Sequence, residues 1–235
     1  MNRINIPPVV KNLLIINVLF FVATWIFQQK GIRLDNILAV YYFDSPNFRF
    51  WQPLSYMFMH GGFAHIFFNM FALYSFGSLL ESRWGVKKFI IFYLITGLGA
   101  LALQWAVQAF EVHQLIGSIT LYDGWQTKIT SQAQADTLGS IYYGGMLGAS
   151  GAIFGLLVAF GMLYPNAELY IMFIPVPVKA KFIIPVYILI ELSLGIAQFE
   201  GDSIAHYAHL GGALIGFILV KIWKDKQTTF YTYYE

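Results

Sequence analysis

Six long apolar segments constrain this chain more than any other feature of its sequence. Each is long enough, or nearly so, to cross about 30 Å of hydrocarbon at about 1.5 Å per helical residue. The 235 residues are 58% hydrophobic and 11% charged, with a mean hydropathy of +0.62. A soluble domain usually carries about 25% charge, so we expect an all-α membrane protein. The predicted membrane helices are 12–28, 53–81, 88–110, 145–164, 181–199 and 205–223.

The rest of the composition narrows the class further. The chain shows no internal repeat, so residues 1–235 are interpreted as a single domain. The net charge of +2 is small and its basic residues are scattered, which argues against a nucleic-acid partner. Because the chain has no cysteine, disulfides and thiolate metal sites are excluded. The first apolar run has no small-residue cleavage site before Gln28, so it is interpreted as a membrane helix.

The basic residues indicate an orientation, since cytoplasmic loops are enriched in Lys and Arg. With the N-terminus inside, ten basic residues fall on the inside and four on the outside. The inside set is Arg3, Lys11, Arg83, Lys87, Lys88, Lys179, Lys181, Lys221, Lys224 and Lys226. The outside set is Lys30, Arg33, Arg49 and Lys128. We therefore expect both termini to be cytoplasmic.

Two of the segments assigned to the outside are long. Residues 31–52 are too apolar for a free loop, which favours a position in the membrane interface. Residues 111–143 are more polar, with many Ser, Thr and Gln, and this composition predicts a mobile loop. Neither composition indicates a role for its segment.

Three polar residues on three helices fall at one predicted depth. Asn69 is fourteen residues before Arg83, Ser150 fifteen before Pro165 and His209 twelve before Lys221. These separations correspond to roughly 21, 22 and 18 Å along a helix. His65 lies one turn from Asn69 on the same helical face, nearer the outside.

The fourth helix is short for a membrane crossing. From Gly151 to Tyr164 it covers about 21 Å, against a hydrocarbon core of about 30 Å. Irregular backbone at that depth is tolerated only where it lines protein or a water-filled cavity. We therefore predict a re-entrant loop before this helix and a pocket open to the outside. Glycines that suit such a loop are Gly144, Gly145 and Gly148.

Small residues predict that the fourth and sixth helices pack closely. Gly151-xxx-Gly155 lies on the fourth helix and Ala208-xxx-Gly212-xxx-Gly216 on the sixth. Faces of this type let helix backbones approach each other in lipid. Packed together, they would bring the serine and histidine of the common layer within hydrogen-bond reach.

These residues support nucleophilic catalysis. A serine hydroxyl needs a base to take its proton, and His209 is the candidate base for Ser150. Candidate donors to an oxyanion are the Asn69 amide, the His65 ring and the Ser150 backbone N–H at a helix start. Phe154, one turn from the serine, is placed to stack on the His209 ring. With no acidic residue evidently placed to orient His209, the pattern favours a Ser–His dyad.

The ordered motifs resemble those of the rhomboid intramembrane serine proteases. They are His60-(x)4-His65-(x)3-Asn69, Gly148-Ala149-Ser150-Gly151 and Ala208-His209-Leu210-Gly211-Gly212. Trp51 and the group Gly77, Glu81 and Gly85 match further family positions. The resemblance covers nearly the whole chain, but Gln52 stands where the family often has arginine, which puts one loop-anchoring interaction in doubt.

The resemblance implies a six-transmembrane-helix rhomboid bundle with a re-entrant loop before a short fourth helix. It implies an endopeptidase that cuts single-pass transmembrane proteins near the outer end of their membrane segment. Ser150 would be the nucleophile, His209 the base, and His65 with Asn69 the oxyanion donors. Residues 199–204 would form a cap over the site. Supporting residues would be Gly148, Gly151, Phe154, His60 and His206.

Further expectations concern partners and location. The partners are transmembrane substrates and the lipid bilayer, with no cofactor, and the oligomeric state stays open. The compact six-helix form favours a bacterial plasma (inner) membrane, crossed several times.

Two features leave alternatives open. Four histidines toward the outer side invite a metal site, but no His-Glu-x-x-His motif or third ligand supports one. Glu191 lies in the middle of an apolar helix, where an ionisable group is by default a functional candidate. A structural, hydrogen-bonded role for Glu191 is favoured over a proton-carrying one.

Two other functions compete with proteolysis. An inactive rhomboid-like protein would capture transmembrane clients without cutting them, yet such relatives usually lack the serine or the histidine. A proton-coupled transporter would use Glu191 and the histidines, and would show broken or repeated helices in corresponding halves. No such repeat is present in the sequence.

Overall fold

The computed structural model describes residues 6–170, 176–197 and 205–224, and most of these are helical. The first half contains α1 (Pro8–Gln28), α2 (Leu34–Leu38), α3 (Gln52–Ser55), a 3-10 turn (Tyr56–Phe58), α4 (Phe63–Ala72), a π-helical turn (Leu73–Gly77) and α5 (Ser78–Ile116). The second half contains a 3-10 turn (Trp125–Lys128), α6 (Gln132–Tyr143), α7 (Ser150–Leu163), α8 (Ala180–Ala197) and α9 (His206–Ile222). Strands β1 (Glu168–Leu169) and β2 (Val178–Lys179) pair antiparallel.

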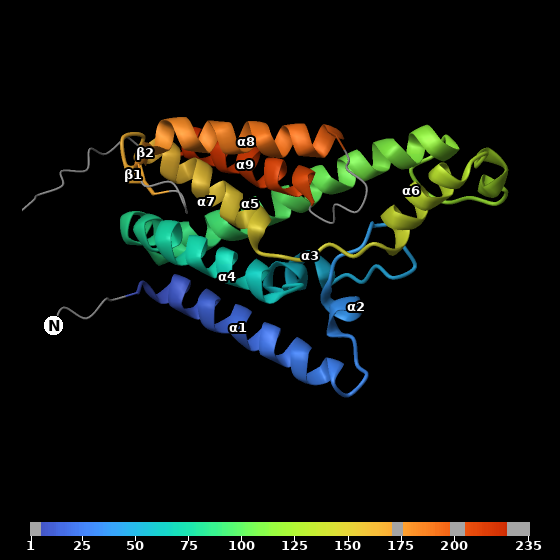
Figure 1. Ribbon diagram of the computed structural model, residues 1–235, viewed down its shortest axis with the longest axis horizontal. Helices are drawn as coiled ribbons and strands as arrows, with labels where there is room; N and C mark the ends of the chain where they lie inside the picture. The colour runs from blue at the N-terminus through green and yellow to red at the C-terminus, as the bar shows by residue number, and fades with distance from the viewer. Residues whose placement is uncertain (1–5, 171–175, 198–204, 225–235) are drawn as a thin grey trace, which may run out of the picture.

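The long helical stretch from Phe63 to Ile116 is broken at one residue. Gly85 has φ +75° and ψ 168°, a conformation that L-residues with a side chain rarely adopt. The chain reverses there, so that α4 and the main part of α5 run in opposite directions (Figure 1). The observed helix ends differ from the predicted ones most at two places. Residues 53–58 form separate short helices before α4 begins at Phe63, and α5 continues to Ile116 rather than 110.

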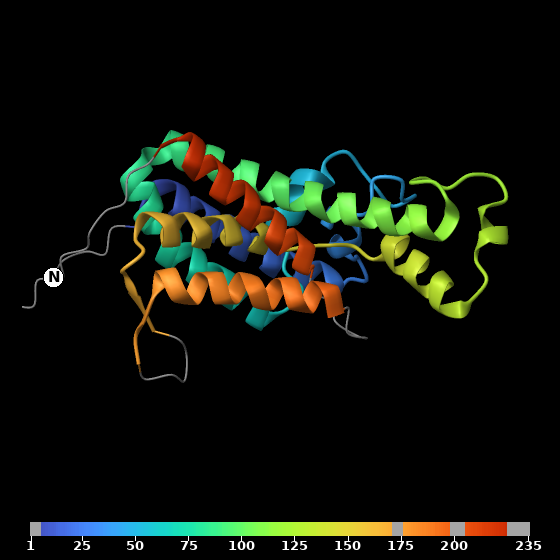
Figure 2. The same cartoon turned by 90° about the horizontal axis from the view of Figure 1, so that it is seen from above.

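Helices α5, α7 and α9 form the centre of the bundle, with α8 against α9 and α1 against the π turn and α5 (Figures 1 and 2). Glycines allow the closest approach. A Cβ added to Gly212 would lie 1.8 Å from the Gly151 carbonyl oxygen, and one on Gly216 would lie 2.7 Å from Gly155 Cα. Since real Cβ atoms never come so close to backbone, this helix pair requires glycine. The faces predicted from small-residue spacing do meet.

The start of α1 is held by a buried carboxylate. Glu81, 2% exposed, accepts hydrogen bonds from the backbone N–H groups of Val9 at 2.9 Å and Val10 at 2.8 Å. No side chain caps this helix from within, and its first amides need acceptors. Glu81 therefore ties α1 to the beginning of α5.

Three helical stretches in the described part of the chain are long and apolar enough to cross a membrane: Pro8–Gln28, Phe63–Ile116 and Ala180–Ala197. Two shorter apolar helices, α7 and α9, accompany them. Large apolar side chains are exposed along α1, α4 and α8, as expected of surfaces that face lipid. The chain is a multi-pass membrane protein.

The end of α5 and residues 117–143 project beyond the bundle as an outer extension (Figures 1 and 2). Residues 111–143 are not the irregular loop that their polar composition suggested, whereas their mobility stays a prediction. The extension contains α6, and its own apolar cluster joins α5, α6 and the first long loop. Its buried members are Tyr42, Val112, Ile116, Leu138, Ile141 and Tyr142. The many Ser, Thr and Gln residues made the segment polar on average, although it contains the apolar residues that pack together here.

Candidate active site

Ser150, at the start of α7, lies next to His209 on α9. The two residues are 59 positions apart in the chain, and His209 Nε2 lies 2.8 Å from Ser150 Oγ. The Phe154 ring stacks on the His209 ring, with centroids 4.3 Å apart and planes 9° from parallel. Ser150 is half-buried and His209 is 9% exposed. A partly accessible hydroxyl thus faces a ring nitrogen that is held in place by stacking.

The loop before Ser150 is non-helical and is fixed at two points. Val40 and Met146 exchange two backbone hydrogen bonds, of 2.9 and 2.8 Å. The Gly148 N–H donates to the Tyr56 carbonyl at 2.9 Å. These bonds satisfy backbone groups that lie outside any helix, as a buried loop requires. The nucleophile candidate therefore sits on a braced loop-to-helix junction.

Gly148 meets two constraints that only glycine satisfies together. Its φ is +135°, and an added Cβ would lie 2.9 Å from His65 Nε2 and 3.4 Å from Ser150 Oγ. The serine hydroxyl and the His65 ring therefore both lie next to the position that a Gly148 side chain would occupy. A side chain at this position would fill the space in front of the hydroxyl. Glycine here keeps that space open.

His65 and Asn69 lie on α4, the helix that packs against α7 from the other side. Asn69 is 7% exposed, and its Nδ2 has no hydrogen-bond partner among the described residues. A buried amide without an acceptor is costly, and in native structures it usually has a specific reason. An oxyanion formed near Ser150 would supply that acceptor. The first amides of α7, Ser150 among them, also lack intrahelical acceptors.

His60, expected to support the site, is buried beside it. It is 4% exposed, and its ring packs edge-on against His65 with centroids 5.0 Å apart. The His60 ring therefore packs against the His65 ring inside the protein.

Gln52 was expected to weaken the anchoring of the first loop. Instead the side-chain amide of Gln52 donates from Nε2 to the carbonyls of Ile37 at 3.3 Å and Asn47 at 3.1 Å.

Glu191 makes hydrogen-bonding contacts to a neighbouring helix, as expected, but its partners were not predicted. No acidic residue was expected beside His209, yet Glu191 Oε2 lies 2.8 Å from His209 Nδ1. The same oxygen lies 2.7 Å from His206 Nδ1. Glu191 is 4% exposed and His206 is 6% exposed. The available signal was an ionisable residue inside an apolar helix, but its partner depended on how α8 is turned toward α9.

A metal ion is the other reading of this cluster, since Glu191, His206 and His209 offer ligand atoms within 4.8 Å of one another. Tetrahedral zinc with bonds of about 2.0–2.1 Å separates neighbouring ligand atoms by about 3.3 Å. The observed oxygen-to-nitrogen distances of 2.8 and 2.7 Å are hydrogen-bond lengths. The cluster as it stands suits two shared hydrogen bonds better than a metal, and the absence of a metal cofactor stays a prediction.

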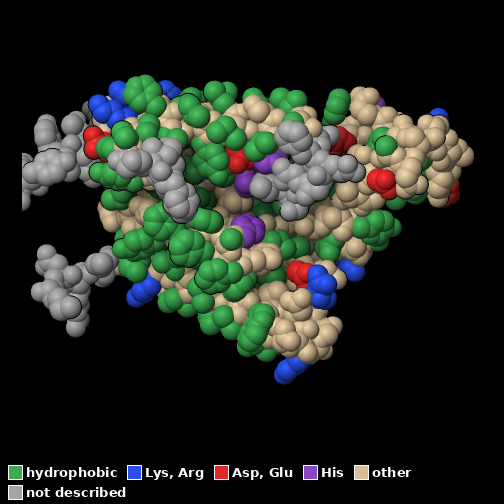
Figure 3. All heavy atoms as spheres, viewed as in Figure 1, with side chains coloured by type: hydrophobic (Ala, Val, Ile, Leu, Met, Phe, Trp, Pro, Cys, Tyr) green, Lys and Arg blue, Asp and Glu red, His purple; other side chains and the backbone are tan. Residues whose placement is uncertain are grey.

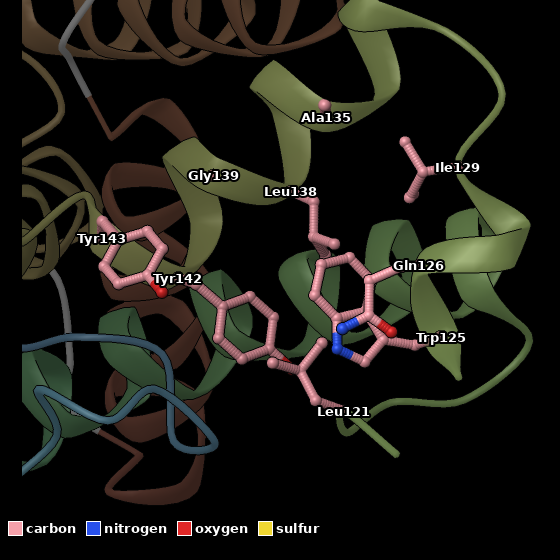
Figure 4. A pocket seen from close by; sticks show the side chains of 9 residues that line it. All are labelled: Leu121, Trp125, Gln126, Ile129, Ala135, Leu138, Gly139, Tyr142 and Tyr143. Carbon is pink, nitrogen blue, oxygen red and sulfur yellow. The ribbon is translucent and has the colours of Figure 1, made fainter. Parts of the chain in front are cut away.

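Histidine side chains are visible among apolar ones near the middle of the face seen in Figure 3. A separate cavity of about 370 Å³ lies in the outer extension. Figure 4 shows its lining, which includes Leu121, Trp125, Leu138 and Tyr142. None of the predicted site residues lines this cavity. The expected cap, residues 199–204, lies outside the described residues.

Comparison with known proteins supplies the family context. A family model described as the Rhomboid domain matches residues 47–225. An uncharacterized mitochondrial rhomboid protein of Schizosaccharomyces pombe is 27% identical over 76% of this chain and 53% of its own length. The chloroplastic Rhomboid-like protein 11 of Arabidopsis thaliana is 27% identical over 88% of this chain and 62% of its own length. The mitochondrial Rhomboid protein 1 of Saccharomyces cerevisiae is 29% identical over 68% of this chain and 38% of its own length. The chain thus spans less than two thirds of these relatives.

Proposed function

Because the chain belongs to the rhomboid family, we propose that it is an intramembrane serine endopeptidase. The observation that carries the proposal is the 2.8 Å contact between Ser150 Oγ and His209 Nε2, two residues brought together from separate helices. A half-buried serine facing a buried imidazole is an arrangement that nucleophilic acyl transfer can use. An inactive client-binding protein has no need of this geometry.

The first half of the reaction would form an acyl-enzyme. As Ser150 Oγ bonds to the scissile carbonyl carbon, its proton passes to His209 Nε2 and the carbonyl π pair moves onto oxygen. When the carbonyl re-forms, the C–N bond breaks and the leaving nitrogen takes the proton from Nε2. Water then repeats the sequence. It gives a proton to Nε2, attacks the acyl carbon and releases Ser150, whose oxygen recovers the proton.

The negative oxygen of each tetrahedral intermediate would be stabilised by donors that are already in place. The Asn69 amide nitrogen has no other partner in the described chain, and the first N–H groups of α7 point out of a helix start. The His65 ring borders the space in front of the serine. Fixed donors of this kind need little reorganisation at the moment of reaction.

We propose single-pass transmembrane proteins as substrates, cut near the outer end of their membrane segment. The chain would cross the bilayer six times, with both termini cytoplasmic, in a bacterial plasma membrane. The distribution of basic residues and the short helix α7 behind a non-helical loop support this arrangement. The chemistry requires no cofactor and no nucleic acid.

The test is cleavage of a single-pass reporter substrate in proteoliposomes, combined with labelling by a fluorophosphonate. Wild-type protein should cut the substrate and be labelled at Ser150, while Ser150→Ala and His209→Ala should lose cleavage. Ser140→Ala is a matched control on α6 in the outer extension, and it should remain active. Binding of substrates without cleavage or labelling would replace this proposal with the client-binding function.

A further inference from the structure

A carboxylate inside the apolar part of the bundle makes two contacts from a single oxygen. Glu191 Oε2 lies 2.8 Å from Nδ1 of His209 and 2.7 Å from Nδ1 of His206. The neighbouring α8 side chains Leu189, Ile190 and Leu192 are exposed, whereas Glu191 is 4% exposed. Glu191 therefore points into the bundle, while the side chains next to it in sequence lie on the exposed face of α8.

Close contact between α8 and α9 explains how this carboxylate reaches the histidines. A Cβ on Gly195 would lie 3.2 Å from His206 Cβ, so the two backbones approach closely one turn from Glu191. The Tyr207 hydroxyl donates to the Gly195 carbonyl at 2.9 Å. Both contacts set the position of α8 along α9 and place Glu191 level with the two rings.

We propose that Glu191 is a positioning residue for His209, and that His206 braces the Glu191 carboxylate. The inference rests on the proposed protease function. For a protease, the active site is then a hydrogen-bonded series of three residues, Ser150, His209 and Glu191. His206 makes a second hydrogen bond to Glu191. The Ser–His pair alone is then an incomplete description of the site.

The direction of the hydrogen bonds gives the physical reason. An ionised carboxylate only accepts hydrogen bonds, so a contact at 2.8 Å selects the His209 form that carries its proton on Nδ1. The Nε2 lone pair is then directed at the Ser150 hydroxyl. When Nε2 takes the serine proton, the resulting imidazolium lies against the carboxylate, which keeps its charge and takes no proton.

His206 has a supporting part in this arrangement. A buried carboxylate without donors would be costly, and the His206 N–H is its second donor. By sharing Oε2, it holds the oxygen with a second hydrogen bond beside that of His209. Asparagine carries an N–H donor near the position of His Nδ1, whereas leucine carries none. The two substitutions therefore separate hydrogen bonding from packing.

The experiment uses the full-length protein in proteoliposomes, with kcat and KM measured for Glu191→Gln, His206→Asn and His206→Leu. Glutamine keeps the shape and removes the charge, so we expect kcat to fall at least about 100-fold with KM little changed. His206→Leu should lower kcat by roughly 10-fold, and His206→Asn should restore most of it. Glu81→Gln is the matched control, because Glu81 is also a buried glutamate bonded to two N–H groups, and its kcat should stay near wild type.

A second readout reports the proton position directly. In protein labelled with ¹⁵N-histidine, NMR should show His209 protonated at Nδ1 in the wild type and shifted toward Nε2 in Glu191→Gln. A wild-type His209 protonated at Nε2 would overturn the inference, even if Glu191→Gln fails to fold. So would a Glu191→Gln protein with kcat within about twofold of wild type.

The two proposals fail in different ways. In one outcome, the wild type cleaves while Ser150→Ala is inactive and Glu191→Gln is fully active. That outcome rejects the positioning role of Glu191 and leaves the protease function standing. If wild type neither cleaves nor reacts with the fluorophosphonate, the protease function is lost and with it this role, whatever the NMR spectrum shows.

Discussion

The active-site region and the outer extension of this protein are built by different means. In the first, glycines bring helix backbones into contact, so that a Cβ on Gly212 would lie 1.8 Å from a carbonyl oxygen. In the second, a cluster of larger side chains fills the space between α5, α6 and the first loop, and Gly139 has open space where a Cβ would be. Geometry set by backbone contact leaves almost no tolerance, whereas side-chain clusters adjust. The comparison predicts that equal substitutions have unequal effects.

The largest effect is expected from Gly212→Ala. The added methyl group must push α9 away from α7, which separates His209 from Ser150. Because a displacement of about 1 Å can cost about 100-fold in rate, we expect kcat/KM for the reporter substrate to fall at least that far. Thermal unfolding should shift downward as well. Wild-type activity in Gly212→Ala would show that the helix contact does not position the site.

Asn69→Leu should separate activity from stability within the active-site region. Its Nδ2 has no partner in the described chain, so removing it breaks no hydrogen bond made by that nitrogen. Loss of an oxyanion donor should lower kcat by about 100-fold, while the midpoint of thermal unfolding changes little. The paired measurement is kcat and thermal unfolding on the same preparation. A large loss of stability with unchanged kcat would assign Asn69 to packing instead.

Tyr142→Phe examines the outer extension. The Tyr142 hydroxyl donates to Asp44 Oδ2 at 2.7 Å, and burial together with this bond raises the pKa of Tyr142, so it is a donor at neutral pH. Its loss should weaken the extension by about 1 kcal/mol. Limited proteolysis within residues 117–143 should become faster, with kcat unchanged. A change in kcat would mean that the extension is coupled to the active site.

Gly139→Ala should have the smallest effect, and of opposite sign. Gly139 lies inside α6, and nothing is within 4 Å of the added methyl group. Alanine in a helix interior is favoured over glycine by about 0.5–1 kcal/mol. Proteolysis of the extension should slow slightly, and cleavage of the reporter should be unaffected. Damage comparable to that in Gly212→Ala would remove the contrast between the two regions.

Several features could be read from the sequence because they depend on neighbouring positions. Low charge and long apolar runs indicate a membrane protein, and small residues spaced four apart predict close helix packing. The glycine motif around Ser150 and the histidine of the sixth apolar segment indicated the candidate reactive pair. Helix ends were less accessible, since the break at Gly85 depends on a single φ angle.

What only the tertiary structure decided concerns residues that meet from different elements. The sequence alone determined that this is a helical membrane protein carrying a Ser–His pair, because composition and helical spacing are local properties. It did not determine that Glu191 meets His209, that Gln52 holds the first loop, or that residues 117–143 fold against Tyr42. Those contacts depend on the rotation and depth of each element, which are set when all helices pack together and not by any one of them.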